Sequence, residues 1–224
     1  MNAGESQRTP WILGVSGASG TPYAAAVLRA LLEAGQSVDL VVSRASRLTL
    51  LDETGVSFRD AHWREDLRAW LSQGADGTPG AFADVDVSDV RHWSAGDLAA
   101  GPSSGSYPAR GMLIVPASTA CVAGVALGLS KDLLQRAAGV TLKERRPLVV
   151  ALRETPLSGS TLRQLVALDD AGATVLPASP AFYAGARHLQ HLVDFVAGRA
   201  LDAVGVPHRL YRRWEGDLGA ARSA

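Results

Sequence analysis

The sequence is poor in several residues that define common classes of protein. Of 224 residues, one is cysteine, two are methionine and 6% are aromatic. Cys121 cannot form a disulfide within the chain, and so little cysteine is typical of a reducing compartment. No apolar run is long enough to span a bilayer, and residues 1–10 lack the apolar core of a secretion signal. We therefore expect a soluble, cytoplasmic protein without a membrane partner.

Neither basic nor acidic residues are in excess. The 22 basic and 22 acidic residues balance to a formal net charge of zero, which argues against nucleic acid as the main partner. The dinucleotide fingerprint G-x-G-x-x-G and the metalloprotease motif H-E-x-x-H are both absent. His188 and His191 have a spacing that suits shared metal ligation, but no third ligand is evident. We expect no metal site.

What the chain does contain is a regular alternation of apolar strands and amphipathic helices. The expected strands are residues 11–16, 38–42, 85–92, 111–116, 147–152 and 173–176. The expected helices are residues 23–34, 44–53, 62–71, 119–127, 132–145, 159–171 and 187–204. This order favours a mostly parallel, doubly wound sheet with right-handed crossovers. The predicted fold class is α/β, a flavodoxin/Rossmann-like three-layer αβα domain.

The domain is expected to span residues 11–214, between a disordered tail at residues 1–10 and a second tail at residues 215–224. Residues 55–110 are expected to form a long insertion or loop region, because glycine, proline and serine are frequent there. One amphipathic helix is expected within it, with four apolar residues on one face: Trp63, Leu67, Trp70 and Leu71.

A glycine-rich segment, Gly-Val-Ser-Gly-Ala-Ser-Gly at residues 14–20, lies where the first strand turns into a helix. Glycine lets a backbone approach a phosphate closely, and a helix amino terminus offers free N–H groups. Ser19 adds a hydroxyl, Thr21 is expected to cap the helix, and Pro22 suits its first turn. The alternative is a tight turn that binds no ligand.

Polar residues follow two further strands. Ser43 ends the second strand, and Ser118 and Thr119 follow the strand at residues 111–116. These hydroxyls can bind a phosphate or flavin, or they can simply cap the helices that begin there. Cys121 allows a nucleophile, but a buried apolar role suits it better because no histidine lies near it in sequence.

A basic block surrounds the strand at residues 147–152. Lys-Glu-Arg-Arg-Pro at residues 143–147 precedes this strand, and Arg-Glu-Thr-Pro-Leu at residues 153–157 follows it. Ligands of open α/β sheets bind outside the carboxyl ends of the strands. There Arg153 can grip a phosphate and Glu154 can move protons, with Lys143 one strand away.

Together, residues 14–20, residues 136–157 and Pro-Ala-Phe-Tyr at residues 180–183 resemble the UbiX-type flavin prenyltransferases. The resemblance extends from Trp11 to about Trp214 and weakens between residues 57 and 100. It implies a homododecamer that joins a dimethylallyl group to N5 and C6 of reduced FMN without a metal. The resemblance implies dimethylallyl phosphate as the donor, although the sequence leaves the pyrophosphate open. It also implies that a UbiD-type decarboxylase uses the prenylated FMN.

The resemblance also implies roles for individual residues. FMN would be held by Gly17, Ala18, Ser19, Ser43, Ser118, Thr119, Ala120, Cys121 and Arg153. Dimethylallyl phosphate would be held by Lys143, Arg153, Glu154, Tyr183 and Arg199, with Tyr183 and Arg199 supplied by a neighbouring subunit. The catalytic residues would be Ser19, Glu154 and Trp214, and Glu53 and Arg136 match family positions at the subunit contact.

Three alternatives remain at this stage. An FMN-dependent cysteine decarboxylase shares the Pro-Ala-Ser turn of residues 116–118, but the basic block argues against it. A flavin carrier would bind FMN without chemistry. A generic NAD enzyme is disfavoured by the missing fingerprint.

Overall fold

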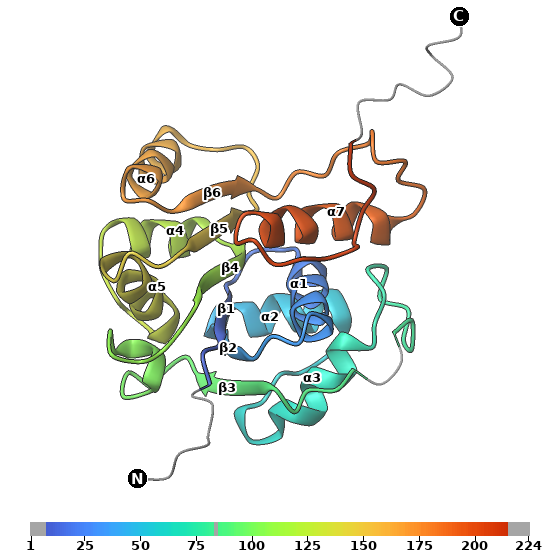
Figure 1. Cartoon of the computed structure of the whole chain (residues 1–224), viewed down its shortest axis with the longest axis horizontal. Helices are drawn as coiled ribbons and strands as arrows, with labels where there is room; N and C mark the ends of the chain where they lie inside the picture. The colour runs from blue at the N-terminus through green and yellow to red at the C-terminus, as the bar shows by residue number, and fades with distance from the viewer. Residues whose placement is uncertain (1–7, 83–84, 215–224) are drawn as a thin grey trace, which may run out of the picture.

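The computed structural model describes residues 8–82 and 85–214, and within them six strands form one parallel sheet (Figure 1). The strands are β1 (Trp11–Val15), β2 (Val38–Val42), β3 (Val90–Ser94), β4 (Gly111–Ala117), β5 (Leu148–Leu152) and β6 (Thr174–Pro177). Their order is β3-β2-β1-β4-β5-β6, and every neighbouring pair is parallel. The predicted α/β fold class is confirmed.

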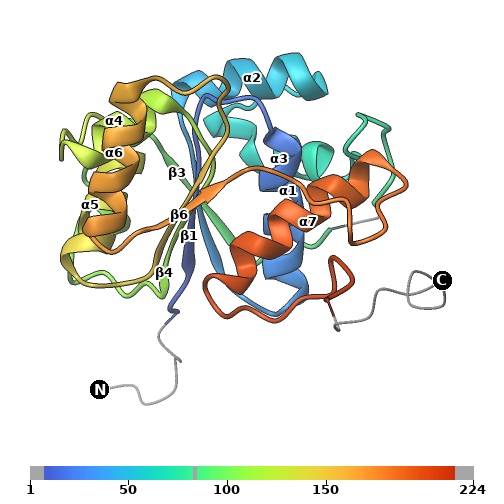
Figure 2. The same cartoon turned by 90° about the horizontal axis from the view of Figure 1, so that it is seen from above.

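Helices cover both faces of the sheet (Figure 2). One side carries α1 (Thr21–Glu33), α2 (Arg44–Thr54), α3 (Trp63–Leu71) and α7 (Leu189–Asp202), and the other carries α4 (Thr119–Ala126), α5 (Leu133–Lys143) and α6 (Gly159–Asp170). Every residue of β1, β2, β4 and β5 is buried. Apart from Asp39 in β2, these strands consist of apolar residues, because helices cover both of their faces.

Residues 55–110 are more ordered than the sequence suggested. They contain the short 3₁₀ helices η1 (Asp60–His62) and η2 (Gly101–Ser103), the helix α3 and the edge strand β3. Leu67, Trp70 and Leu71 of α3 are buried as expected. The expected strand at residues 85–92 was misplaced, because the Asp86 carboxylate accepts hydrogen bonds from the backbone and hydroxyl of Ser88 and holds a turn there.

One buried aspartate ties this region to the sheet. Asp39 of β2 is fully buried and accepts hydrogen bonds from Trp93 Nε1 at 2.9 Å and Tyr107 Oη at 2.7 Å. Its other oxygen pairs with the Arg8 guanidinium. Residues 8–10 of the expected disordered tail are therefore fixed to the sheet, while residues 1–7 and the tail at 215–224 lie outside the described residues. Within the described part of the chain, no helix is long and apolar enough to cross a membrane.

Candidate functional site

The predicted polar segments meet at the carboxyl edge of the sheet, where strand order reverses between β1 and β4. Backbone hydrogen bonds join neighbouring strand ends there: Ser43 N to Val15 O at 3.0 Å, and Ser16 N to Pro116 O at 3.2 Å. Arg153 N donates to the carbonyl of Ala117 at 3.1 Å. A reversal of strand order opens a crevice in doubly wound sheets, and ligands bind in it.

A first pocket of about 250 Å³ lies in this crevice. It is lined by Ser16, Gly17, Ser43, Arg44, Ala45, Ser118, Ala120, Cys121, Asp132, Leu134 and Gln135. Helices α2, α4 and α5 all begin at this pocket, so their positive amino ends converge on it. The pocket suits a ligand with an anionic group.

Two of the three serines at this pocket cap helices. Ser43 Oγ accepts a hydrogen bond from Ser46 N at 3.1 Å, and Ser118 Oγ accepts one from Cys121 N at 3.3 Å. The capping interpretation of both residues is confirmed. The Ser43 hydroxyl also donates to Ser46 Oγ at 3.2 Å. The Ser118 hydroxyl still has a proton to donate, so its capping role does not exclude a ligand.

Gly17 is required by close packing. A Cβ atom at this position would lie 2.5 Å from the Cβ of Ala45, at the start of α2. Glycine therefore lets the loop between β1 and α1 lie directly against α2. Ala18, beside it, is buried.

Cys121 is not a nucleophile at neutral pH. Burial raises the pKa of its thiol to about 12, with a further contribution from the Asp132 charge. The expected apolar role of Cys121 is therefore supported, and the thiol forms part of the pocket wall.

A second pocket of about 350 Å³ lies on the other side of the glycine loop. It is lined by Ser19, Gly20, Pro22, Tyr23, Glu53, Ala75, Asp76, Arg153, Leu189 and Val193. Ser19 is exposed to this pocket, whereas Ser16 and Gly17 face the first one. The loop thus separates two compartments of one crevice.

Glu53 takes the capping position that was expected for Thr21. Its carboxylate accepts hydrogen bonds from Gly20 N at 2.9 Å, Thr21 N at 2.8 Å and Thr21 Oγ1 at 2.6 Å. The prediction of Thr21 as the cap was wrong, because Gly20 occupies that position and the cap comes from the end of α2. Burial opposes ionisation of Glu53, but hydrogen bonds from Ser19, Thr21 and the backbone hold its pKa below the usual value.

Arg153 has an unsatisfied donor in the second pocket. Its Nε atom is buried and has no hydrogen-bond partner among the described residues. Buried polar groups are normally paired, so an orphaned guanidinium nitrogen points to a ligand that supplies an acceptor. Glu154 is exposed beside it and accepts a hydrogen bond from Thr155 N at 2.9 Å.

Lys143 does not join Arg153 and Glu154 within one chain. It is the last residue of α5 and precedes β5, so it lies at the amino edge of the sheet. There it pairs with Glu144 beside Gly105. Arg136 lies in the same area, where its Nε donates to Ser103 O at 3.0 Å. Within one chain, Lys143 and Arg153 are separated by the length of β5, and the role of Lys143 at the phosphate stays a prediction.

An aromatic cluster forms at α7. The ring of Tyr183 lies 5.8 Å from the rings of Phe195 and Trp214, edge to face with both. Tyr183 and Trp214 are 57% and 55% exposed although they contact each other. Arg199 lies one turn after Phe195 and is also exposed. These three candidate residues therefore gather on a surface, and none of them lines either pocket.

Metal ligands do not gather anywhere in residues 8–82 and 85–214: no group of three or more histidine, cysteine or acidic side chains is placed to hold an ion.

The fold and the crevice define an FMN-type flavoprotein, and comparisons with known proteins agree. The flavoprotein family model matches residues 2–201. The chain is 84% identical to the flavin prenyltransferase UbiX of Streptomyces coelicolor over 213 residues, covering 95% of this chain and 98% of that one. It is 41% identical to the UbiX of Synechocystis, covering 93% and 97%. The chain belongs to the UbiX family of flavin prenyltransferases.

Solved structures give the same assignment. AnUbiX (PadA1), in complex with FMN and dimethylallyl pyrophosphate, is 34% identical with a TM-score of 0.78 and covers 94% of this chain and 99% of its own. A dodecameric FMN-dependent UbiX-like decarboxylase from Escherichia coli O157:H7 is also 34% identical, with a TM-score of 0.77, covering 93% and 100%. The cysteine decarboxylase TvaF, 14% identical with a TM-score of 0.51 and covering 88% and 98%, shares the fold alone.

Proposed function

We propose that this protein transfers a dimethylallyl group to N5 and C6 of reduced FMN and so makes prenylated FMN. The observation that carries the proposal is the orphaned Nε of Arg153 at the crevice of a chain that is 84% identical to a flavin prenyltransferase. The dimethylallyl donor carries phosphate, which is the acceptor that a guanidinium binds best. A UbiD-type decarboxylase is the proposed recipient of the product.

The crevice fits FMN. The loops and helix starts that follow β1, β2, β4 and β5 carry the proposed FMN ligands, and backbone hydrogen bonds join the ends of these strands. The proposed ligands are Gly17, Ala18, Ser19, Ser43, Ser118, Thr119, Ala120, Cys121 and Arg153. Three features suit a phosphate-bearing flavin. The loop has no Cβ at Gly17, hydroxyls lie at two helix starts, and the amino ends of three helices point to the pocket. When bound, reduced FMN supplies the nucleophilic positions N5 and C6.

The chain's own residues would act on the donor and on protons. Breaking the allylic C–O bond builds charge on the departing phosphate, which Lys143, Arg153 and Arg199 would stabilise. Tyr183 and Trp214 would form an aromatic wall beside the electron-poor allyl group. Ser19 and Glu154 would relay a proton between the phosphate and the flavin ring.

This set of residues requires more than one chain. Lys143 lies at the opposite sheet edge from Arg153, and the cluster of Tyr183 and Trp214 opens to the surface. We therefore infer a homo-oligomer in which neighbouring copies complete each site. The dodecameric state of the similar Escherichia coli protein supports a dodecamer.

The test is anaerobic incubation with reduced FMN and either dimethylallyl phosphate or its pyrophosphate, followed by mass spectrometry of the extracted flavin. A gain of one dimethylallyl unit is expected, and the faster donor identifies the phosphate form. Unmodified flavin with both donors would contradict the proposal, and tight binding of that flavin would favour a carrier.

A further inference from the structure

Several side chains of the segment after α7 donate hydrogen bonds to one carboxylate of that helix. Residues 207–214, here called the C-terminal strap, run back beside α7 and end at Trp214 (Figure 1). Asp202, the last residue of α7, accepts hydrogen bonds from three side chains of the strap. The distances are 2.5 Å from Tyr211 Oη, 2.7 Å from Arg213 Nη2 and 3.1 Å from His208 Nε2.

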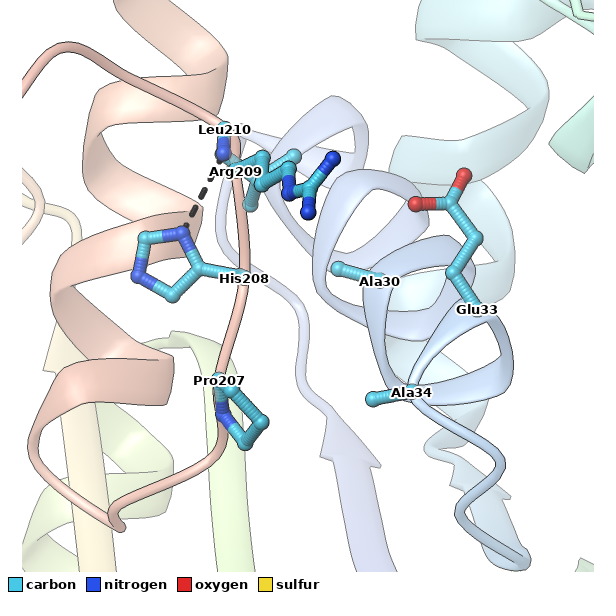
Figure 3. Close-up of a pocket in the computed structure, with 7 residues that line it drawn as sticks. All are labelled: Ala30, Glu33, Ala34, Pro207, His208, Arg209 and Leu210. Atoms are coloured by element: carbon cyan, nitrogen blue, oxygen red, sulfur yellow. Dashed lines mark hydrogen bonds between the residues drawn. The ribbon is translucent and has the colours of Figure 1, made fainter.

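The other ring nitrogen of His208 shows which nitrogen donates to Asp202. Its Nδ1 accepts a hydrogen bond from Leu210 N at 3.2 Å, the bond drawn in Figure 3. Nε2 is therefore the ring nitrogen that donates to Asp202. The His208 side chain is only 2% exposed, so this bond is shielded from water.

The strap packs closely on α7 but leaves a space beside α1. A cavity of about 330 Å³ lies between Pro207–Leu210 and the end of α1, bounded on the helix by Ala30, Glu33 and Ala34 (Figure 3). On the α7 side, Gly198 lets the strap come close, since a Cβ there would lie 2.6 Å from the rings of both His208 and Tyr211. The strap is therefore fixed against α7, at Asp202.

Asp202 is otherwise badly placed for a carboxylate. Negative charge at the carboxyl end of a helix is unfavourable, because the helix dipole is negative there. Arg199 Nη1, at 3.1 Å, and Arg213 both pair with this one carboxylate. Although partial burial opposes ionisation, hydrogen bonds from Tyr211, Arg213 and His208 hold the pKa of Asp202 at about 2. The guanidiniums of Arg199 and Arg213 carry two positive charges, and the Asp202 carboxylate neutralises one of them. One positive charge therefore remains at Arg199 and Arg213, and Arg199 is a candidate phosphate ligand.

A series of aromatic contacts leads from Tyr211, which is hydrogen-bonded to Asp202, to Trp214. The ring of Tyr211 lies 4.8 Å from that of Phe195, Phe195 lies 5.8 Å from Tyr183, and Tyr183 lies 5.8 Å from Trp214. Tyr211 therefore contacts Phe195 through its ring and Asp202 through its hydroxyl. Displacement of the strap would carry Trp214 off Tyr183.

We propose that Asp202 is a positioning residue that locks the C-terminal strap, setting Trp214 on Tyr183 and orienting Arg199 toward the prenyl donor. Its effect on the reaction rests on the proposed function of those three residues. The lock itself does not, since it is defined by contacts within the chain.

The test compares Asp202→Asn with Asp170→Asn, which removes an exposed carboxylate from the last position of α6. Trypsin should cut the exposed Arg209, Arg212 and Arg213 about tenfold faster in Asp202→Asn than in the wild-type protein, because cutting follows local opening. Asp170→Asn should match the wild type. Equal cutting in all three proteins would overturn the lock.

Fluorescence gives a second readout that needs no activity. Asp202→Asn should shift the tryptophan emission, and the shift should vanish when Trp214 is replaced by Phe. A shift that persists without Trp214 would mean that the substitution acts elsewhere in the fold. Gly198→Ala leaves Asp202 intact but pushes the strap away, so it should reproduce both changes.

Kinetics then test the link to the reaction. In Asp202→Asn, KM for dimethylallyl phosphate should rise about tenfold, as expected for a lost charge-assisted contact, while Kd for FMN stays unchanged. A released strap with an unchanged KM would contradict the role in donor binding. If the wild-type protein makes no prenylated flavin, the proposed function fails, whereas proteolysis and fluorescence still decide whether Asp202 is the lock.

Discussion

Lys143 and Arg153 lie at opposite edges of the β-sheet although only β5 and its flanking turns separate them in sequence. Arg153 has a buried Nε without a partner in the described chain, whereas Lys143 is paired with Glu144 on the surface. We propose that both cations stabilise one phosphate during the reaction. A site built from two copies of the chain would bring Lys143 and Arg153 together.

Gly17→Ala should weaken FMN binding. The new Cβ would lie 2.5 Å from Ala45, so α2 must move away from the first pocket. We expect Kd for FMN, measured by flavin fluorescence, to rise at least about tenfold, in line with the cost of overpacking a close contact. The matched control is Gly139→Ala in α5, where a Cβ meets nothing within 4 Å. That control should bind FMN normally and be slightly more stable, as expected for alanine in a helix.

Glu53 should make stability depend on pH. Its folded pKa lies below the usual value, so its ionised form stabilises the folded protein. Relative to Glu53→Gln, the wild-type protein should be more stable at pH 6, and the difference should shrink as the pH falls below about 4.5 through the folded pKa. Urea unfolding at several pH values measures this difference. The neighbouring exposed Asp52→Asn serves as control, and an equal pH dependence there would contradict the assignment to Glu53.

Cys121 should resist alkylation. Burial raises its thiol pKa to about 12, so almost no thiolate exists at pH 8. Intact mass spectrometry should show little reaction of the folded protein with iodoacetamide and full reaction after unfolding in urea. Rapid labelling of the folded protein would mean that the first pocket exposes a reactive thiol.

Glu154→Gln should slow the chemistry and spare binding. The variant keeps the size of the side chain but cannot move a proton, and general acid–base catalysis is worth about 100-fold or more. We expect the rate of prenylated flavin formation to fall by about that factor while Kd for FMN stays the same. A rate equal to the wild type would remove Glu154 from the proposed proton relay.

The sequence predicted the sheet well because its central strands are continuous apolar runs between helices. It placed Ser43, Ser118 and Arg153 correctly at one edge, since strand ends of a parallel sheet share an edge. It misplaced β3, because an Asp86 turn and a half-exposed edge strand have the same polar composition.

The remaining errors come from contacts between distant segments. The local sequence does not indicate that Glu53 caps α1 at Thr21 or that Asp39 binds Arg8, since the two residues of each pair lie about thirty residues apart. Lys143 and Arg153 lie apart within one chain because a strand carries the chain from one sheet edge to the other. Neighbours in sequence on either side of a strand are therefore distant in space.

The most direct measurement is co-expression of Lys143→Ala and Arg153→Ala chains, with mass spectrometry of the flavin made by the mixed oligomer. Each variant alone should be inactive. If neighbouring copies supply the two side chains, random assembly leaves about one quarter of the sites with both, and activity near a quarter of the wild type should return. Activity no higher than that of either variant alone would contradict the shared site.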